Sequence, residues 1–404
     1  MDKLPFLPII VGTDMNAYNM AISFHEAYGI NPVLVGKDSL SFTSLSTITD
    51  TIEYRSSLAD SDQFANILID VAKKYETPGK TLLLVGTNDL YVRLIIENAE
   101  TLREYFTFNY IDENLMNQLQ VKANFYKLCA EHGIETPTTF FYDCSSKEPF
   151  EEEMMYPVII KPSNGIEYSQ NKFAGQQKVY KVESSDELQE VIRTITASGY
   201  RDELIIQDFI PGDDTFMWDS VIYASSKKQT QLVTFAQVVL QEHTVTAIGN
   251  YTALITRYNE EIMKKLQNFL EAVGYTGFAN FDLKYDERDG TFKVFEVNIR
   301  QGRSSYYVTA LGHNMAQYFV DDLIYQKDKP VTYLNEDFLF TVVPKIVLRK
   351  FVDNSEVRKD VIRLIKKGKY GNPLFYKKDK HLKRKFYMFA RQLNYYKKYK
   401  NNQW

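Results

Sequence analysis

The sequence predicts a mixed protein, in which an α/β domain with a doubly wound parallel sheet is followed by an α+β region. Three apolar runs near the N-terminus, at residues 7–12, 32–36 and 81–86, have the composition of buried strands. Segments with helical spacing of apolar residues separate these runs. Strands that alternate with helices form parallel sheets with both faces covered. We therefore expect residues 1–112 to form the α/β domain.

The carboxyl ends of these strands are the expected place for a ligand in an open α/β sheet. The first strand ends in Gly12-Thr13-Asp14 and lacks the G-x-G-x-x-G fingerprint, which disfavours a dinucleotide. Polar side chains follow the first and third strands: Thr13, Asp14, Asn16, Asn88 and Asp89. Each of them can equally serve as a loop residue that caps a helix.

The composition excludes several classes of protein. Hydrophobic residues make up 44% and charged residues 25% of the 404 residues, as in ordinary globular proteins with two or three subdomains. No apolar run approaches the ~18 residues of a membrane-spanning helix, and residues 1–12 lack a signal peptide's apolar core. Cys129 and Cys144 fit a reducing compartment, so we expect a cytoplasmic protein. Five scattered histidines without a His-x-x-x-His pair argue against a zinc enzyme.

The net charge of −4 hides a strongly basic C-terminal segment. Residues 345–404 hold 19 Lys/Arg against 4 Asp/Glu, and the residues before them hold 29 against 48. A basic, aromatic-rich end favours an anionic partner, which can be a membrane surface, a nucleic acid or a polyanionic substrate. The alternative is a solvated helical end that docks on the acidic remainder of the chain.

Residues 277–305 predict a hairpin with its turn at Arg288-Asp289-Gly290, because Asp-Gly between alternating apolar runs is typical of such turns. Asp282 and Glu296 are equidistant from Asp289, so they are expected opposite each other on one face, with Asn298 two residues on. Opposed like charges destabilise a sheet, and a divalent cation would remove that penalty. Oxygen ligands of this kind suit Mg²⁺. Alone, Asp282 would be an ordinary surface acid.

Two lysines and one turn complete the pattern. Lys161 lies within the apolar strand 157–162, where a buried lysine needs a counter-charge. Lys122 lies on a predicted amphipathic helix at 115–133, where a lone lysine is usually solvent-exposed. The segment 204–214, LIIQDFIPGDD, is a strand followed by a turn.

The fixed order of these features resembles the ATP-grasp superfamily of carboxylate–amine ligases, over about residues 110–325. The resemblance implies a pre-ATP-grasp domain at 1–112 and an ATP-grasp domain at 113–330, whose small ATP-binding subdomain covers about 136–210. Residues 331–404 would be a basic, aromatic-rich C-terminal extension. It also implies ATP and Mg²⁺, or Mn²⁺ in its place, as cofactors.

The resemblance implies a role for each residue of the pattern. Lys122 and Lys161 would bind the phosphates of the nucleotide. The backbone of Asp208 and Ile210 would bind the edge of adenine, Gln207 the exocyclic amine of adenine, and Asp214 the ribose hydroxyls. Metal binding falls to Asp282, Glu296 and Asn298. Arg300, with Lys161, would be catalytic and stabilise the acyl phosphate. Arg303, Ser304 and Ser305 would grip the substrate carboxylate, which a guanidinium binds bidentately.

Two departures from the family pattern affect the site. The loop after Lys161 has few glycines, which argues against a phosphate lid of the usual kind, although Ser163, Asn164 and Ser169 could still donate hydrogen bonds to phosphate. Asn280 stands where some relatives carry Arg, which puts more weight on Arg300 and Arg303.

Longer strings resemble one branch of the family, the bacterial D-aspartate ligases. They are IPGDD, AIGNY (247–251), YTGFANFD (275–282) and FEVNIRQGRSSYYVT (295–309). This resemblance implies activation of D-aspartate at its β-carboxylate and transfer to the lysine ε-amine of an anionic, UDP-linked or lipid-linked peptidoglycan precursor. The basic tail could then hold the protein at the inner membrane face, and no nucleic acid partner is expected. The alternatives are a ligase for another amino acid or dipeptide, and a nucleotide-binding scaffold without catalysis.

Overall fold

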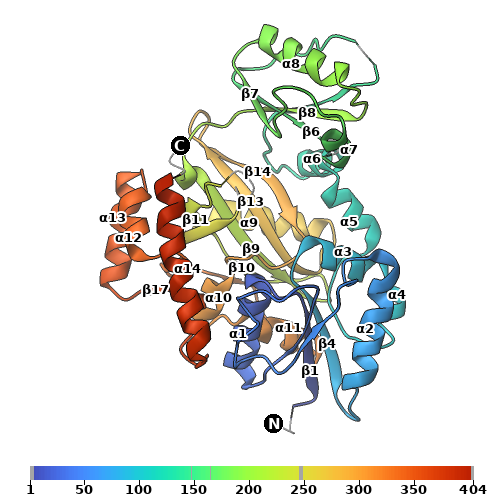
Figure 1. The fold of residues 1–404 in the computed structure, drawn as a ribbon, viewed down its shortest axis with the longest axis vertical. Helices are drawn as coiled ribbons and strands as arrows, with labels where there is room; N and C mark the ends of the chain where they lie inside the picture. Colours follow the sequence, from blue (N-terminus) through green and yellow to red (C-terminus); the bar gives the residue numbers. More distant parts are fainter. Residues whose placement is uncertain (1–3, 147, 164, 245–248, 402–404) are drawn as a thin grey trace. The chain divides into compact units, whose positions relative to one another are not determined.

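A computed structural model describes residues 4–146, 148–163, 165–244 and 249–401 (Figure 1). The chain forms two units. The main unit comprises Met1–Leu128, Asp213–Leu283 and Glu296–Trp404, and the small unit comprises Cys129–Gly212 and Lys284–Phe295. The domain boundaries predicted from the sequence, after residues 112 and 330, remain predictions.

The N-terminal part of the main unit is the predicted α/β domain. Its parallel sheet has the order β3-β2-β1-β4. The strands are β1 (Phe6–Val11), β2 (Val33–Gly36), β3 (Ile52–Tyr54) and β4 (Thr81–Gly86), and the helices are α1 (Met15–Tyr28), α2 (Ser61–Tyr75), α3 (Asp89–Glu97) and α4 (Ala99–Leu102). Figure 1 shows α1 on one side of the sheet and α2 and α3 on the other, as in a doubly wound fold. The sequence analysis missed β3, which is short and half-exposed.

Local chemistry fixes where α1 begins and ends. The Asp14 side chain accepts a hydrogen bond from the Ala17 amide at 2.9 Å, which caps the first turn. Gly29 ends the helix with φ of 63°, a left-handed conformation that favours glycine. Gly12, directly after β1, lies against Thr87, directly after β4. A Cβ at position 12 would overlap Thr87 Oγ1, so the close approach requires glycine. The carboxyl ends of β1 and β4 therefore meet closely.

A nine-stranded sheet forms the rest of the main unit's core. Its main path is β14-β13-β9-β11-β12-β16-β17, and β10 pairs with β9 and β15. The strands are β9 (Met217–Ala224), β10 (Thr230–Val233), β11 (Ala236–Gln241), β12 (Tyr251–Thr256), β13 (Gly277–Asp286), β14 (Thr291–Asn298), β15 (Thr332–Tyr333), β16 (Leu339–Thr341) and β17 (Tyr370–Gly371). β13 and β14 are the predicted hairpin, and Gly290 in its turn has φ of 73°.

The remaining helices of the main unit are α5 (Glu113–Gln120), α6 (Lys122–Glu131), α9 (Glu260–Ala272), α10 (Tyr306–Ala310), α11 (Met315–Leu323), α12 (Lys345–Phe351), α13 (Ser355–Lys366) and α14 (Leu382–Asn401). The unit also has two short 3₁₀ turns, η1 (Asp214–Phe216) and η2 (Pro373–Phe375). The last residues of α6 belong to the small unit. The single helix predicted at 115–133 is wrong. Val121 adopts an extended conformation and ends α5, so Lys122 opens a new helix.

The small unit is an antiparallel sheet covered by a helix. Its strand order is β5-β8-β6-β7. The elements are β5 (Thr139–Asp143), β6 (Val158–Pro162), α7 (Gly165–Gln170), β7 (Tyr180–Val182), α8 (Ser185–Ala197) and β8 (Glu203–Asp208). Leu188, Ile192 and Ile195 of α8 pack on the inward side chains of β6 and β8, which builds a separate apolar core.

The basic C-terminal segment docks on the main unit through one face of α14. Arg384 is 1% exposed and pairs with Asp379 at 3.3 Å, while its Nη1 donates to the Leu374 carbonyl at 3.1 Å. The Asp379 carboxylate also accepts hydrogen bonds from Tyr18 and Ser46 at 3.0 and 2.8 Å. The docking alternative is therefore correct for this face of α14.

We expect Asp379→Ala to destabilise the protein by about 3–5 kcal/mol, because it leaves the buried guanidinium of Arg384 without its counter-charge. The measurement is the midpoint of urea unfolding. Asp337→Ala is the matched control, because Asp337 pairs with Arg363 at 3.0 Å but both side chains are more than a third exposed. A surface pair of this kind contributes about 0–1 kcal/mol. Equal shifts for the two variants would contradict the expectation.

Candidate active site

Asp282 and Asn298 lie together on the hairpin, as predicted. Asn298 Nδ2, on β14, donates to Asp282 Oδ2 on β13 at 3.0 Å. The same amide nitrogen lies 3.3 Å from the Asn280 carbonyl, to which it also donates. The Tyr251 hydroxyl of β12 adds a further hydrogen bond to the Asp282 carboxylate. Three strands of one sheet thus fix the position of this carboxylate.

The surroundings of Asp282 are strongly negative. Desolvation raises the pKa of Asp282 well above its usual range, and the charges of Glu296 and Asp219 raise it further. Asp219 on β9 is fully buried, and its burial raises its own pKa to about 6. Asn280 Nδ2 and the Tyr307 hydroxyl donate to it at 2.6 and 3.1 Å. A cation at this position would relieve the repulsion.

The oxygen donors here are two carboxylates and an amide. Among the described residues, no three His, Cys, Asp or Glu side chains form a group that could hold a metal ion. A set made of Asp282, Glu296 and the Asn298 amide oxygen still has the hard oxygen ligands that Mg²⁺ prefers.

Lys122 lies beside the same carboxylates. As the first residue of α6, it donates from Nζ to Glu296 Oε2 at 2.7 Å. The two side chains are 26% and 46% exposed, so both can also reach a ligand. A residue predicted to bind phosphate and one predicted to bind metal are therefore neighbours.

Arg300 continues this network to the N-terminal sheet. Its Nη2 donates to the Asn298 amide oxygen at 3.2 Å and to Asp89 Oδ2 at 3.0 Å, and its Nε lies 2.9 Å from Asp89 Oδ1. Asp89 opens α3 after the carboxyl end of β4. This paired geometry holds the guanidinium rigidly at the edge of the sheet.

The other polar residues at this edge have mainly structural partners. Asn88 caps α3 by accepting from the Tyr91 amide at 2.8 Å, and Thr13 Oγ1 donates to the Asp38 carbonyl. Asn16 Nδ2 donates to the Thr87 and Gln301 carbonyls, each at 2.8 Å. Asp14 likewise caps α1 and, like Asn88, is partly exposed.

Asp14 faces two guanidinium groups. Desolvation raises its pKa, while the Ala17 hydrogen bond and the positive charges of Arg303 and Arg300 act in the opposite direction. The carboxyl edge of the N-terminal sheet therefore carries two arginines and two carboxylates, of which Asp89 is paired with Arg300 and Asp14 is within electrostatic range of both arginines.

The loop that carries Arg303 is fixed to the N-terminal sheet and α1. Gln301 Nε2 donates to the Gly86 carbonyl at 3.0 Å, and Asn19 Nδ2 donates to the Arg303 carbonyl at 2.8 Å. Ser304 and Ser305 are 3% and 0% exposed, whereas Arg303 is partly exposed. Of the three predicted substrate residues, Arg303 is thus the one with accessible surface. The two serines lie inside the main unit.

Asp214, predicted for the ribose, is held by two residues that the sequence analysis did not identify. Gln241 Nε2 donates to Asp214 Oδ1 at 2.7 Å, and His243 Nε2 lies 2.8 Å from Oδ2. The Gln241 amide completes the contact with Oδ2 at 3.1 Å. The preceding Asp213 caps η1 instead.

The small unit holds the other predicted nucleotide residues. Lys161 lies on β6 opposite Ile205 of β8, and is partly exposed. Gln207 is 3% exposed and donates from Nε2 to Thr139 Oγ1 at 2.9 Å. Ile210 is equally buried.

The carboxylate of Asp208, at the end of β8, is paired with Arg288. Arg288 Nη1 and Nη2 donate to its two oxygens at 3.2 and 2.6 Å, and its own amide donates to the Thr138 carbonyl at 2.9 Å. The arrangement suits a residue that is expected to act through its backbone rather than its side chain.

The structure describes the predicted phosphate lid and the AIGNY string (247–251) only in part. Asn164 and residues 247–248 lie outside the described residues. Ser163 donates from Oγ to the Glu203 carbonyl at 2.8 Å.

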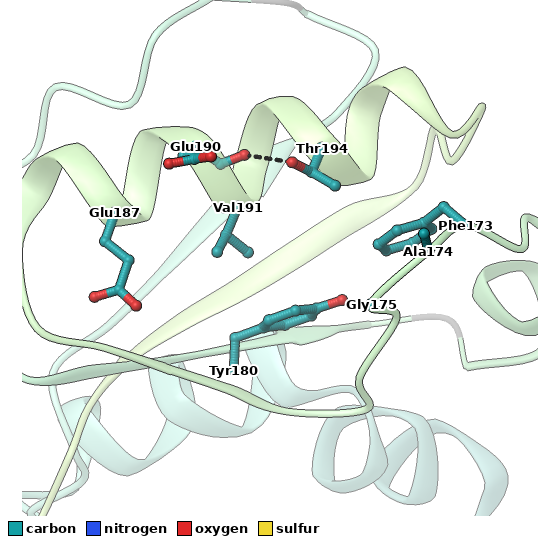
Figure 2. A pocket seen from close by; sticks show the side chains of 8 residues that line it. All are labelled: Phe173, Ala174, Gly175, Tyr180, Glu187, Glu190, Val191 and Thr194. Carbon is teal, nitrogen blue, oxygen red and sulfur yellow. Dashed lines mark hydrogen bonds between the residues drawn. The ribbon is translucent and has the colours of Figure 1, made fainter.

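Figure 2 shows a pocket of about 260 Å³ in the small unit, between α8 and the segment 173–180. Glu187, Val191 and Thr194 project toward it from the helix, and Phe173 and Tyr180 from the other side. None of the predicted site residues in the described part of the chain lines this pocket.

Comparison with known proteins agrees with the geometry. Residues 120–304 match the family model described as an ATP-grasp domain. The chain belongs to the ATP-grasp family, and it is an ATP-dependent carboxylate–amine ligase. It is 36% identical over 411 aligned residues to a D-aspartate ligase of Enterococcus faecium (strain Aus0004), and the alignment covers 98% of this chain and 96% of the relative. The resemblance described above is thereby confirmed at the level of the family.

Solved structures show the same fold. An L-amino acid ligase from Bacillus licheniformis superposes with a TM-score of 0.55 at 17% identity, covering 79% of this chain and 74% of the other. An N5-carboxyaminoimidazole ribonucleotide synthetase from Thermotoga maritima gives 0.53 at 13% identity, covering 83% and 79%. The predicted combination of an N-terminal parallel α/β domain with an ATP-grasp fold is confirmed.

We expect Lys122→Met to lower kcat/KM for ATP by at least about tenfold, because it removes the positive charge beside Glu296. Steady-state ADP release at varied ATP concentration measures this. Lys127→Met is the matched control, because Lys127 is an exposed lysine of the same helix. The importance of Lys122 would be refuted by a kcat/KM equal to that of the control.

Proposed function

We propose that this ligase activates the β-carboxylate of D-aspartate and joins it to the lysine ε-amine of a peptidoglycan precursor. The choice of D-aspartate as the acid rests on the charged residues at the carboxyl edge of the N-terminal sheet. The positive charges of Arg300 and Arg303 act on the partly exposed Asp14, and a substrate carboxylate would take the place of Asp89 at Arg300. Aspartate has two carboxylates and one ammonium group, so it is complementary to two guanidinium groups and one carboxylate. The name of the 36% identical relative supports the same acid.

The nucleotide roles proposed for the two units rest on the resemblance and on side-chain chemistry. In the small unit, Lys161 would bind phosphate, and Gln207 with the backbone of Asp208 and Ile210 would bind adenine. In the main unit, Lys122 would bind phosphate and Asp214 the ribose hydroxyls. The contacts of Asp214 with Gln241 and His243 keep its carboxylate in one orientation.

We assign the oxygen ligands of Asp282, Glu296 and Asn298 to Mg²⁺, with Mn²⁺ as a substitute. When bound, the ion would neutralise phosphate charge as the γ-phosphoryl group moves. Asn298 donates to Asp282 and accepts from Arg300, so its amide links the metal carboxylate to the guanidinium that faces the substrate.

The reaction takes two steps. The substrate carboxylate attacks the γ-phosphorus of ATP, and ADP leaves as the acyl phosphate forms. The amine then attacks the acyl carbon and an amide bond forms. The bond between the acyl carbon and the phosphate oxygen breaks, inorganic phosphate leaves with its electron pair, and the amine proton passes to the solvent. Arg300 is positioned to stabilise negative charge on the acyl phosphate and the tetrahedral intermediate. The protein contributes mainly positioning and charge.

The acceptor is proposed to be an anionic muropeptide precursor, either UDP-linked or lipid-linked. Because the reaction consumes ATP, we place it in the cytoplasm. The basic C-terminal segment would attract such a precursor electrostatically.

An amino-acid panel tests the choice of acid. ADP release is measured with D-aspartate, L-aspartate, D-asparagine, D-glutamate and D-alanine, each with and without a lysine-containing muropeptide. D-Asparagine is the sharpest comparison, because it differs from D-aspartate in the β-carboxylate alone. We expect turnover with D-aspartate plus muropeptide. Turnover that does not depend on D-aspartate would identify a ligase for another amino acid.

We expect Asp14→Asn to raise KM for D-aspartate by about 10- to 100-fold, because it removes the negative partner of the ammonium group. KM for ATP should change little. Asparagine is as good a helix cap as aspartate, so α1 should remain intact. Asp38→Asn, at an exposed neighbouring position, is the control. If Asp14→Asn left KM for D-aspartate unchanged, the ammonium group would have to bind elsewhere.

A further inference from the structure

Helix α14 has a second face that the docking contacts leave uncovered. Its inward residues are Arg384, Met388, Gln392, Tyr395 and Tyr399, which recur every three or four positions and are buried. Figure 1 shows α14 lying along the outside of the main unit beside α12 and α13. The opposite side of the helix therefore faces away from the main unit.

This outer face carries an apolar stripe. Leu382, Phe386, Phe389 and Leu393 are 80%, 68%, 58% and 62% exposed. Their spacing of four, three and four residues places them on one side of the helix. Single exposed apolar residues are common on protein surfaces, but a continuous row of large ones marks an interaction surface.

Exposed lysines surround the stripe. Lys383, Lys385, Lys397 and Lys400 of the helix are exposed, as are Lys377, Lys378 and Lys380 just before it. Residues 382–401 contain no Asp or Glu. The partner must therefore be both apolar and anionic.

We propose that the outer face of α14 binds the surface of a membrane rich in anionic lipids, with the helix lying parallel to the bilayer plane. Leu382, Phe386, Phe389 and Leu393 enter the boundary between headgroups and acyl chains, and the lysines contact lipid phosphates. A basic helix with large apolar residues on one side has this mode of binding. No helix among the described residues is both long and apolar enough to cross a membrane, so the contact is peripheral.

Two other partners fit less well. A second copy of the chain would bring lysines against lysines across a twofold contact, which is repulsive. A single-stranded nucleic acid would use the phenylalanines for stacking but would leave Leu382 and Leu393 without a role. A lipid surface satisfies the apolar and the basic residues together.

Vesicle flotation of the full chain tests the membrane contact, and it needs neither ATP nor D-aspartate, so its outcome is separate from that of the ligase assays. The probes are vesicles of pure phosphatidylcholine and of phosphatidylcholine mixed with phosphatidylglycerol. We expect binding to the anionic vesicles that weakens with added salt. Phe386→Ser/Phe389→Ser should weaken it by at least about tenfold, and Lys383→Gln/Lys385→Gln should reduce its salt dependence.

The control is Met155→Ser, which removes a 70% exposed apolar side chain elsewhere. Ligase activity on soluble substrates should be unchanged in Phe386→Ser/Phe389→Ser and Met155→Ser, which shows that they are folded, and an unchanged midpoint of urea unfolding shows the same for Lys383→Gln/Lys385→Gln. Failure of the wild-type chain to float with anionic vesicles, or equal flotation of Phe386→Ser/Phe389→Ser, would overturn the proposal. So would a dimer, detected by sedimentation, that the double serine variant dissociates.

Discussion

Repulsion between carboxylates at the junction of β9, β13 and β14 is the constraint on which the rest of the main unit's site depends. The charges of the buried Asp219 and of the half-exposed Glu296 both act on Asp282, and each of the three carboxylates has its own compensating neighbours. Amides and hydroxyls donate to the two aspartates, and Lys122 pairs with Glu296. A sheet would not retain such opposed charges for stability alone, because apolar side chains of similar size would be less costly there. The Mg²⁺ proposed for Asp282, Glu296 and Asn298 would offset this repulsion.

A second set of contacts joins the N-terminal α/β domain to the strand that carries these groups. Asn16 and Asn19 of α1 donate to the backbone carbonyls of Gln301 and Arg303 in the loop after β14, and the Gln301 side chain donates to the Gly86 carbonyl at the end of β4. Backbone contacts of this kind fix the path of the loop without limiting which side chains it presents. The position of Arg303 therefore depends on helix α1, although almost 300 residues separate them in the sequence.

The elements that sequence reasoning predicted are those with strong local signals. The buried strands of the N-terminal domain and the β13–β14 hairpin follow from apolar periodicity and the turn at Gly290. Asp219, Tyr251 and Tyr307 were missed because each lies on a different element. Nothing near them in the sequence indicates that Asp219 and Tyr251 lie close to Asp282 or that Tyr307 donates to Asp219. The break at Val121 was missed because the apolar spacing continues across it. Ser304 and Ser305 looked suitable for substrate by composition, but their burial depends on how the loop packs.

The pairing of Arg300 with Asp89 has a consequence for how an acid would enter this site. Asp89 presents to the guanidinium the same functional group as a substrate carboxylate, at ordinary hydrogen-bond distances. The carboxylate of an incoming acid would thus replace the Asp89 carboxylate at Arg300, and it would not have to displace water from an exposed guanidinium. Asp89 would thus occupy the place of the substrate carboxylate until the acid binds, and the hydrogen bond to Asn298 would keep Arg300 oriented during the exchange. Selectivity would then depend on competition between Asp89 and the substrate carboxylate for Arg300. Only an acid that makes additional contacts with the protein would displace Asp89.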